Sequence, residues 1–216
     1  MAQPTVDASA RSQRAPDAPG YGPLRFSEVV LRTLHFERLR EWYRTVLGVD
    51  PYFERTPTAE DLANAIPGLS RAADLRLCFF RVHLDYPYTQ VLGIFQVPDL
   101  ADAPSTTPGL HHLQLRHAAL GDLFDRYERL KAAGITPHRT ANHGPGTSFY
   151  YHDPDGNMVE LSAANFATEA EYLAYLASDA YRANPSGLEI DADEYVARYR
   201  RGVPQAELVR IGGGAA

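Results

Sequence analysis

Hydrophobic and polar residues follow two periodicities along this chain, and the same succession of patterns occurs twice. Short apolar runs with strand-like character lie at 26–31 and 110–115. After each run, apolar side chains recur at the spacing of an amphipathic helix. Gly48 and Gly134 then stand where a helix commonly ends. The two predicted helical stripes are Phe36, Leu39, Tyr43, Val46 and Leu47, and Leu120, Leu123, Phe124, Tyr127 and Leu130.

Further strand patterns follow each predicted helix. In the first half, residues 75–84 and 91–97 are predicted strands on either side of a turn-prone Asp-Tyr-Pro-Tyr stretch. In the second half, residues 147–151 and 157–162 are predicted strands around the turn Asp153-Pro154-Asp155-Gly156. The sequence therefore predicts an α+β fold in which a strand–helix–strands unit is repeated.

Composition suggests where the repeated units begin and end. Residues 1–22 are rich in Ala, Pro, Gln and Asp and lack a continuous apolar run, which indicates a mobile tail rather than a signal peptide. The first module is predicted at 23–98, a linker at 99–108 and the second module at 109–165. The closing Gly-Gly-Gly-Ala-Ala is expected to be loose as well.

The remainder, 166–216, is predicted to be a C-terminal extension with helical stretches at 169–181 and 193–201. A breaker, Asn184-Pro185-Ser186-Gly187, lies between them. We expect this extension to clamp the core or to form an oligomer contact, so a homodimer is one arrangement that it allows. No chemistry is predicted there.

Composition and charge narrow the classes of partner. The 216 residues carry a net charge of -6, which gives no electrostatic reason to expect nucleic acid or an anionic membrane. No apolar run reaches the roughly 18 residues of a membrane span. A single cysteine excludes an internal disulfide framework and is compatible with a reducing cytosol. We therefore expect a cytoplasmic protein whose partner is a small molecule.

Alignment of the two halves places Glu28 opposite His112, and Glu160 lies on the strand after the Asp-Gly turn. A carboxylate among apolar neighbours is costly to bury unless a cation, an arginine or a proton accompanies it. Glu160 is therefore either a metal ligand or the partner of Arg32 or Arg116. Two carboxylates and one imidazole leave coordination positions open, which suits Fe(II), Mn(II) or another divalent ion that also binds substrate.

Strand geometry limits which of two neighbouring histidines joins this site. Alternate side chains of a strand share a face, so His112, Gln114 and Arg116 are expected together. His111 and His112 are adjacent and are expected to point to opposite faces. One of them is then free to bind metal while the other is packed or exposed.

Four motifs occur in a specific order and spacing, namely VVLRT with the following VLG (29–48), GLHH (109–112), ERLKAAGI (128–135) and HGPGTSFYYHDPDGNMVEL (143–161). Together they resemble the vicinal oxygen chelate superfamily, which includes glyoxalases, fosfomycin- and bleomycin-resistance proteins and type I extradiol dioxygenases. The resemblance covers roughly 26–166 and implies two tandem βαβββ modules that form half-barrels around a metal. The segment 184–202 is similar to an extension of dioxygenase-like members.

In extradiol members, the resemblance implies two histidines and one glutamate around a ferrous ion. His112 matches the second histidine and Glu160 matches the glutamate. Glu28 stands where the first histidine is expected. The additional carboxylate makes the predicted site harder and more anionic, which favours Mn(II) or Mg(II) as alternatives to Fe(II).

The resemblance also suggests acid–base residues. In ring-cleaving relatives the stretch 88–94 would carry a histidine that takes a proton from the catechol, but this chain has Thr89 and Gln90 there. Gln90 is predicted to orient the substrate or to bind the metal through its amide oxygen. His143 and Tyr150 match an imidazole and a phenol near the oxygen-binding position, with a loop-capping histidine and a core tyrosine as the alternatives.

Three functions remain open. The favoured one is a metal-dependent oxygenase of the extradiol type, acting on a small aromatic or vicinal-dioxygen substrate. The second is a metal-dependent isomerase, lyase or epimerase of the glyoxalase type. The third is a binding protein that sequesters a small aromatic compound. Its cleft would be lined by aromatic residues whose other explanation is core packing, namely Phe79, Phe80, Phe95, Tyr150 and Tyr151.

Overall fold

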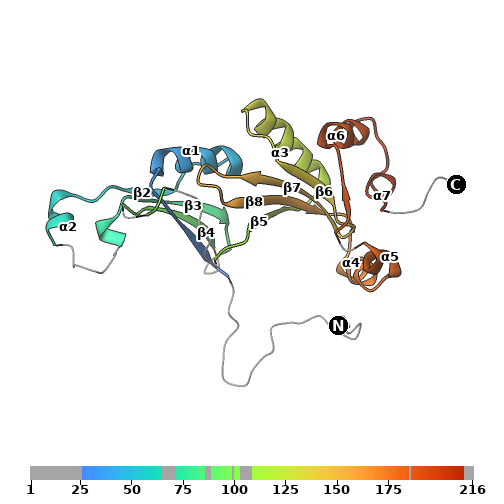
Figure 1. Cartoon of the computed structure of the whole chain (residues 1–216), viewed down its shortest axis with the longest axis horizontal. Coiled ribbons are helices and arrows are strands. Elements are labelled where there is room, and N and C mark those ends of the chain that lie inside the picture. Colours follow the sequence, from blue (N-terminus) through green and yellow to red (C-terminus); the bar gives the residue numbers. More distant parts are fainter. Residues whose placement is uncertain are drawn as a thin grey trace, which may run out of the picture. The chain divides into compact units, whose positions relative to one another are not determined.

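A computed structural model describes residues 26–64, 72–85, 89–98, 100–102, 109–184 and 186–211. The predicted tail at 1–22, most of the predicted linker and the closing residues 212–216 lie outside these ranges. Contacts divide the described chain into two compact units. The N-terminal unit comprises the described residues up to 102 together with the turn 153–156, and the C-terminal unit comprises the rest. Each unit contains one β-sheet with helices (Figure 1).

The N-terminal unit has a four-stranded sheet with α1 (Phe36–Leu47) packed against it. The predicted stripe of α1 is buried except for Leu47, which is partly exposed. Gly48 ends the helix in the left-handed region at φ 70°, where glycine meets no steric penalty. Short elements α2 (Ala59–Ala63) and η1 (Ala72–Asp74) follow the second strand. The strands lie in the order β1 (Glu28–Thr33), β4 (Gln90–Gln96), β3 (Leu77–His83) and β2 (Phe53–Arg55).

The C-terminal unit repeats this topology and adds one strand. In both units the first strand of the module is parallel to the last, and the remaining pairs are antiparallel. The predicted duplicated βαβββ order and the α+β class are therefore confirmed. The strands lie in the order β5 (Leu113–His117), β8 (Met158–Ala164), β7 (Gly146–His152), β6 (Arg139–Asn142) and β9 (Leu188–Glu189).

Helix α3 (Leu120–Ala132) covers one face of the C-terminal sheet (Figure 1). Its predicted apolar stripe is buried, as expected. Phe149 on β7 stacks on the ring of Phe124 at 6.2 Å and meets the ring of Tyr127 edge-on at 5.1 Å. Because side chains alternate along a strand, Ser148 and Tyr150 lie on the opposite face. We call this face, opposite α3, the site face.

The described part of the C-terminal extension contains four helices and the strand β9. The predicted helical stretch at 169–181 is divided into two helices, because the Ser178 side chain accepts a hydrogen bond from Tyr181 N and starts a second helix there. None of the helices in the described ranges combines the length and apolar character that a membrane crossing needs. The helices are α4 (Glu169–Leu176), α5 (Asp179–Ala183), α6 (Ala192–Arg200) and α7 (Gln205–Leu208).

Candidate functional site

A buried carboxylate, Glu160, lies at the centre of the site face. It is only 4% exposed, although glutamate side chains are almost never fully buried without a partner. Its Oε1 accepts hydrogen bonds from Gln114 Nε2 at 2.8 Å and from Ser148 Oγ at 2.6 Å. Gln114 and Ser148 lie on the strands that flank β8, so the sheet itself supplies these donors. The other oxygen, Oε2, remains directed toward His112.

His112 Nε2 lies 3.1 Å from Glu160 Oε2. Two ligand atoms that each lie about 2.1 Å from one cation, at right angles to each other, are separated by about 3.0 Å. The spacing of these two atoms therefore fits neighbouring ligands of one divalent ion. An imidazole nitrogen and a carboxylate oxygen are also donor types that Fe(II) and Mn(II) accept. The residues present in this unit thus fit part of a metal site.

The histidine pair differs from its prediction. Strand β5 begins at Leu113 rather than at residue 110, so His111 and His112 precede the strand. They do not point to opposite faces: their Nδ1 atoms lie 2.8 Å apart and their rings meet edge-on at 5.1 Å. One of these nitrogens donates to the other, so the tautomers of the two histidines are linked. His111 is therefore a neighbour of the candidate ligand.

His143 and Tyr150, both predicted from the resemblance, are in contact. His143 Nε2 lies 2.9 Å from the Tyr150 hydroxyl. Tyr150 stands directly opposite Glu160 in the β7–β8 register, so the two pairs adjoin on the site face. Burial raises the pKa of Tyr150, and the negative charge of Glu160 raises it further. Tyr150 is therefore a neutral phenol at neutral pH and can donate a hydrogen bond.

Glu28 and Gln90 belong to the N-terminal unit. Glu28 begins β1 and pairs in register with Val91, the neighbour of Gln90 on β4. Both side chains are exposed. Within the described ranges, no three His, Cys, Asp or Glu side chains are arranged to hold a metal ion. Glu28 as the third ligand and Gln90 as an orienting residue therefore stay predictions.

The aromatic residues predicted to line a cleft divide into two groups. Phe80 and Tyr151 are at most 1% exposed and belong to the core, as the alternative explanation held. Phe79 and Phe95 are only half-buried, and their rings meet edge-on at 5.7 Å. Phe53, which sequence analysis missed, is 47% exposed and lies 6.1 Å from the Phe79 ring. These three phenylalanines form an exposed aromatic surface on the N-terminal sheet.

A glycine makes room for this aromatic surface. Gly93 lies opposite Phe79 in the β3–β4 register. A Cβ atom at Gly93 would lie 3.0 Å from the Phe79 ring and 3.1 Å from the Val30 side chain. The absence of a side chain at residue 93 therefore lets the Phe79 ring lie across the strand.

A second histidine pair was missed. The rings of His138 and His152 stack at 4.0 Å, beside Tyr150. Burial lowers the pKa of His138, and the positive charges of His152 and Arg139 lower it further. Arg139 also lies over the Tyr150 ring at 5.2 Å. The alternation along β7 that places Tyr150 on the site face also places His152 there, and this periodicity was the available signal.

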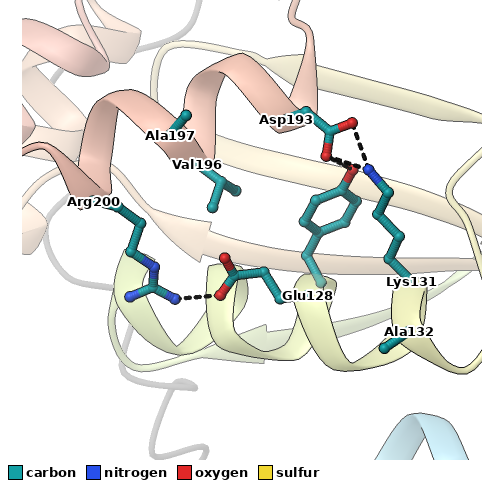
Figure 2. Close-up of a pocket in the computed structure, with 8 residues that line it drawn as sticks. Glu128, Lys131, Ala132, Asp193, Val196, Ala197 and Arg200 are labelled. Atoms are coloured by element: carbon teal, nitrogen blue, oxygen red, sulfur yellow. Dashed lines mark hydrogen bonds and ion pairs between the residues drawn. The ribbon is translucent and has the colours of Figure 1, made fainter.

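A groove of about 430 Å³ lies elsewhere, between α3 and α6 (Figure 2). Lys131 Nζ contacts the Asp193 carboxylate at 2.5 Å, and Arg200 contacts Glu128 at 2.6 Å. The cations that line the groove are thus already paired. Because α3 covers the face opposite Glu160, the groove is separate from the candidate site. It lies where helix α6 of the extension packs beside α3.

Comparison with known proteins identifies the family. The profile of the glyoxalase/bleomycin resistance protein/dioxygenase superfamily matches residues 25–161. Biphenyl-2,3-diol 1,2-dioxygenase 2 from Rhodococcus globerulus is 36% identical over 168 residues, which are 77% of this chain and 77% of that protein. This chain belongs to the glyoxalase/bleomycin resistance protein/dioxygenase superfamily.

Other members of the superfamily are also similar to this chain. Biphenyl-2,3-diol 1,2-dioxygenase 3 from Rhodococcus globerulus is 32% identical over 187 residues, which are 85% of this chain and 86% of that protein. A solved glyoxylase/bleomycin resistance protein/dioxygenase domain from Frankia sp. EAN1pec covers 67% of this chain and 98% of its own, with 18% identity and a TM-score of 0.47.

The superfamily match ends within the second module. It stops at residue 161, one position after Glu160 on β8. It therefore covers the first module, the second module as far as the middle of β8, and all six predicted site residues. The helices α4–α7 and the strand β9 follow it.

Proposed function

We propose that this protein is a metal-dependent dioxygenase of the extradiol ring-cleaving type, acting on a small aromatic vicinal diol. One observation carries the proposal: a single sheet face holds the His112–Glu160 pair next to the His143–Tyr150 pair. Identity of 36% and 32% to two proteins named as biphenyl-2,3-diol dioxygenases supports it.

In this proposal His112 and Glu160 bind a divalent metal, with Glu28 as the third ligand. Fe(II) is the favoured ion, and Mn(II) or another divalent ion is the alternative. When bound, the ion supplies a positive centre at which two neighbouring substrate oxygens and dioxygen can coordinate. The hydrogen bonds from Gln114 and Ser148 keep the Glu160 carboxylate oriented toward His112.

The remaining site residues handle protons and position the substrate. His143 takes a proton from a substrate hydroxyl and returns one later, as a general base and then a general acid. Tyr150 is a neutral phenol beside His143, and its hydroxyl can turn to donate a hydrogen bond to a substrate oxygen when the substrate binds. Gln90 orients the substrate through its amide. The exposed surface of Phe53, Phe79 and Phe95 suits contact with an aromatic ring.

Two residues favour a second function. Glu28 stands where the resemblance leads us to expect histidine, and Gln90 supplies no base at neutral pH. A site richer in carboxylates suits a glyoxalase-type isomerase, lyase or epimerase, in which a glutamate moves a proton next to a polarised carbonyl. Such an enzyme works without oxygen. A binding protein, the third candidate, would retain its ligand after the metal is chelated.

Oxygen uptake separates these functions. Protein purified without oxygen and supplied with Fe(II) is mixed with biphenyl-2,3-diol in an oxygen electrode. We expect one O2 consumed per diol, and a loss of about 100-fold or more in His143→Gln, because general acid–base catalysis contributes about that much. Glu169→Gln, an exposed carboxylate on α4, is the matched control and should match the wild type. Iron-loaded protein that takes up no oxygen with this diol or with simpler catechols would contradict the proposal.

A further inference from the structure

The C-terminal extension provides a partner for His143. The carbonyl oxygen of Ser186 lies 2.8 Å from His143 Nδ1. A carbonyl oxygen only accepts hydrogen bonds, so Nδ1 must carry the proton. In a neutral imidazole the lone pair is then on Nε2, which lies 2.9 Å from the Tyr150 hydroxyl. Tyr150 therefore donates to Nε2, and the resting His143 presents its basic nitrogen to the site face.

The opposite tautomer would reverse this arrangement. With a proton on Nε2, the imidazole would offer Tyr150 a donor in place of an acceptor, and the lone pair would face the extension. The Ser186 carbonyl accepts from Nδ1–H whether the ring is neutral or protonated. It can therefore hold the ring in one orientation while a proton moves at Nε2.

The residue before His143 is also fixed by the extension. Asn142 is buried, and its Nδ2 donates to the Val209 carbonyl at 2.8 Å and to the Tyr195 hydroxyl at 3.1 Å. Its Oδ1 accepts from Gly144 N at 2.9 Å. The Val209 carbonyl can only accept and the Gly144 N–H can only donate, so the Asn142 side-chain amide has one possible orientation. Residues after β8 thus hold the chain immediately before His143.

Gly187 permits the close approach of Ser186. It has φ +74°, and a Cβ atom there would lie 2.1 Å from the Asn142 carbonyl oxygen and 2.5 Å from His143 Cα. Those are backbone atoms, so a side chain could not be accommodated by a rotamer change. Asn184 Nδ2 donates to the Gly187 carbonyl at 2.8 Å and closes the turn. Immediately afterwards, β9 pairs with β6.

We propose that the C-terminal extension is a working part of the active site: the Ser186 carbonyl, brought close by Gly187, sets the tautomer and orientation of His143. Ser186 and Gly187 are positioning residues, since they act through His143. The catalytic part of this inference rests on the proposed function, in which His143 moves a proton. The segment that positions His143 lies beyond the superfamily match, which ends at residue 161.

Nitrogen NMR of the histidine side chains tests this inference. The full-length protein is loaded with Zn(II), a diamagnetic ion, and the His143 signals are assigned by comparison with His143→Gln. We expect the wild type to show one tautomer, with the proton on Nδ1. Gly187→Ala should shift His143 to a mixture or to the Nε2–H form. Oxygen uptake by the iron-loaded variant should fall by about tenfold or more while its metal content stays at the wild-type level.

Gly202→Ala is the matched control. Gly202 also lies in the extension with a positive φ, +81°, but a Cβ atom there would meet nothing within 4 Å. It imposes the same kind of backbone strain and should leave the His143 tautomer unchanged. If Gly187→Ala does not fold, Asn184→Ala, which only removes the side chain that closes the turn, should produce a smaller shift in the same direction.

The outcomes separate this inference from the proposed function. A wild-type His143 that carries its proton on Nε2, or a folded Gly187→Ala variant that keeps the Nδ1–H form, would overturn the positioning role. A protein that shows the expected tautomers but takes up no oxygen would support the positioning role and contradict the dioxygenase.

Discussion

Tyr150 and Glu160 lie directly opposite each other on the antiparallel strands β7 and β8, with both side chains on the site face. The phenol is 8% exposed and the carboxylate 4% exposed. A negative charge this close to a buried phenol opposes its ionisation. The strand pairing therefore places a neutral phenol, which can donate a hydrogen bond, next to a candidate metal ligand.

Removing the negative charge of Glu160 should lower the pKa of the Tyr150 phenol. In Glu160→Gln we expect the pKa of Tyr150 to fall toward its ordinary value, while burial, the larger cause, still holds it above that value. An NMR titration with 13C-labelled tyrosine, assigned through Tyr150→Phe, measures this pKa. Ser162→Ala, also on β8, is the control. An unchanged or higher pKa in Glu160→Gln would contradict the electrostatic account.

The predicted role of Glu28 as a metal ligand can be tested by substitution. If Glu28 is a ligand, Glu28→Ala should weaken metal binding by about tenfold or more, since losing even an outer-shell partner typically costs 10–100-fold. Glu28→His should tighten Fe(II) binding, because it restores the ligand that the resemblance leads us to expect. Competition with a chelator measures both affinities, and Glu60→Gln on α2 is the control. Unchanged affinity in Glu28→Ala would remove this residue from the site.

Stability should depend on pH through His117. Arg126 Nε donates to His117 Nε2 at 3.2 Å. Burial lowers the pKa of His117, and the positive charge of Arg126 lowers it further. The unfolded chain therefore binds this proton at higher pH than the folded chain does. The contribution of neutral His117 to the free energy of unfolding is therefore present above about pH 6.5, the usual histidine pKa. It is lost as the pH falls through that value and below.

His117→Gln removes the titrating group but keeps an acceptor for Arg126. We expect its melting temperature to fall less than that of the wild type between pH 7.5 and about pH 5. The residual dependence should include His138, whose pKa is lowered in the same direction. Thermal unfolding across this range provides the comparison, and parallel curves for the two proteins would show that His117 does not contribute.

The core of the C-terminal unit depends on Phe149. This residue is fully buried under α3 and contacts the rings of Phe124 and Tyr127. Phe149→Ala should lower the free energy of unfolding by about 3–5 kcal/mol, through lost burial and the cavity left behind. Phe26→Ala removes a side chain that is 69% exposed and should cost less than about 0.5 kcal/mol. Urea unfolding measures both, and a similar cost for the two variants would contradict the packing described here.

Long periodic segments could be predicted from the sequence, and short ones could not. The stripes of α1 and α3 each span more than two helical turns, and Gly48 and Gly134 end or follow them at positive φ. By contrast, β6 has four residues and β9 has two. Strands this short are stabilised by their partners, so their own residues carry little signal.

The displaced start of β5 has a similar cause. The strand was predicted from residue 110, but its pairing with β8 begins at Leu113 opposite Val159. Strand β8 itself begins at Met158, so in this register residues 110 and 111 extend past the start of their partner strand. His112 precedes the first residue of β5 and does not follow its alternation, and it contacts His111.

The site could be predicted only in part, because one of its members is a backbone atom rather than a side chain. Four of its candidates, His112, His143, Tyr150 and Glu160, carry side chains whose chemistry is visible in the sequence, and the C-terminal unit brings them together in two pairs. The partner of His143 is a backbone carbonyl, which every residue possesses. Ser186 could therefore not be distinguished from its neighbours, and only the fold shows that its carbonyl faces an imidazole.

The central claim is that His112 and Glu160 bind one metal ion. Elemental analysis of protein purified without oxygen tests it most directly. We predict about one equivalent of a divalent metal, principally iron, in the wild type, and its loss in both His112→Ala and Glu160→Ala. Wild-type protein without bound metal, or variants that retain the full equivalent, would contradict the claim.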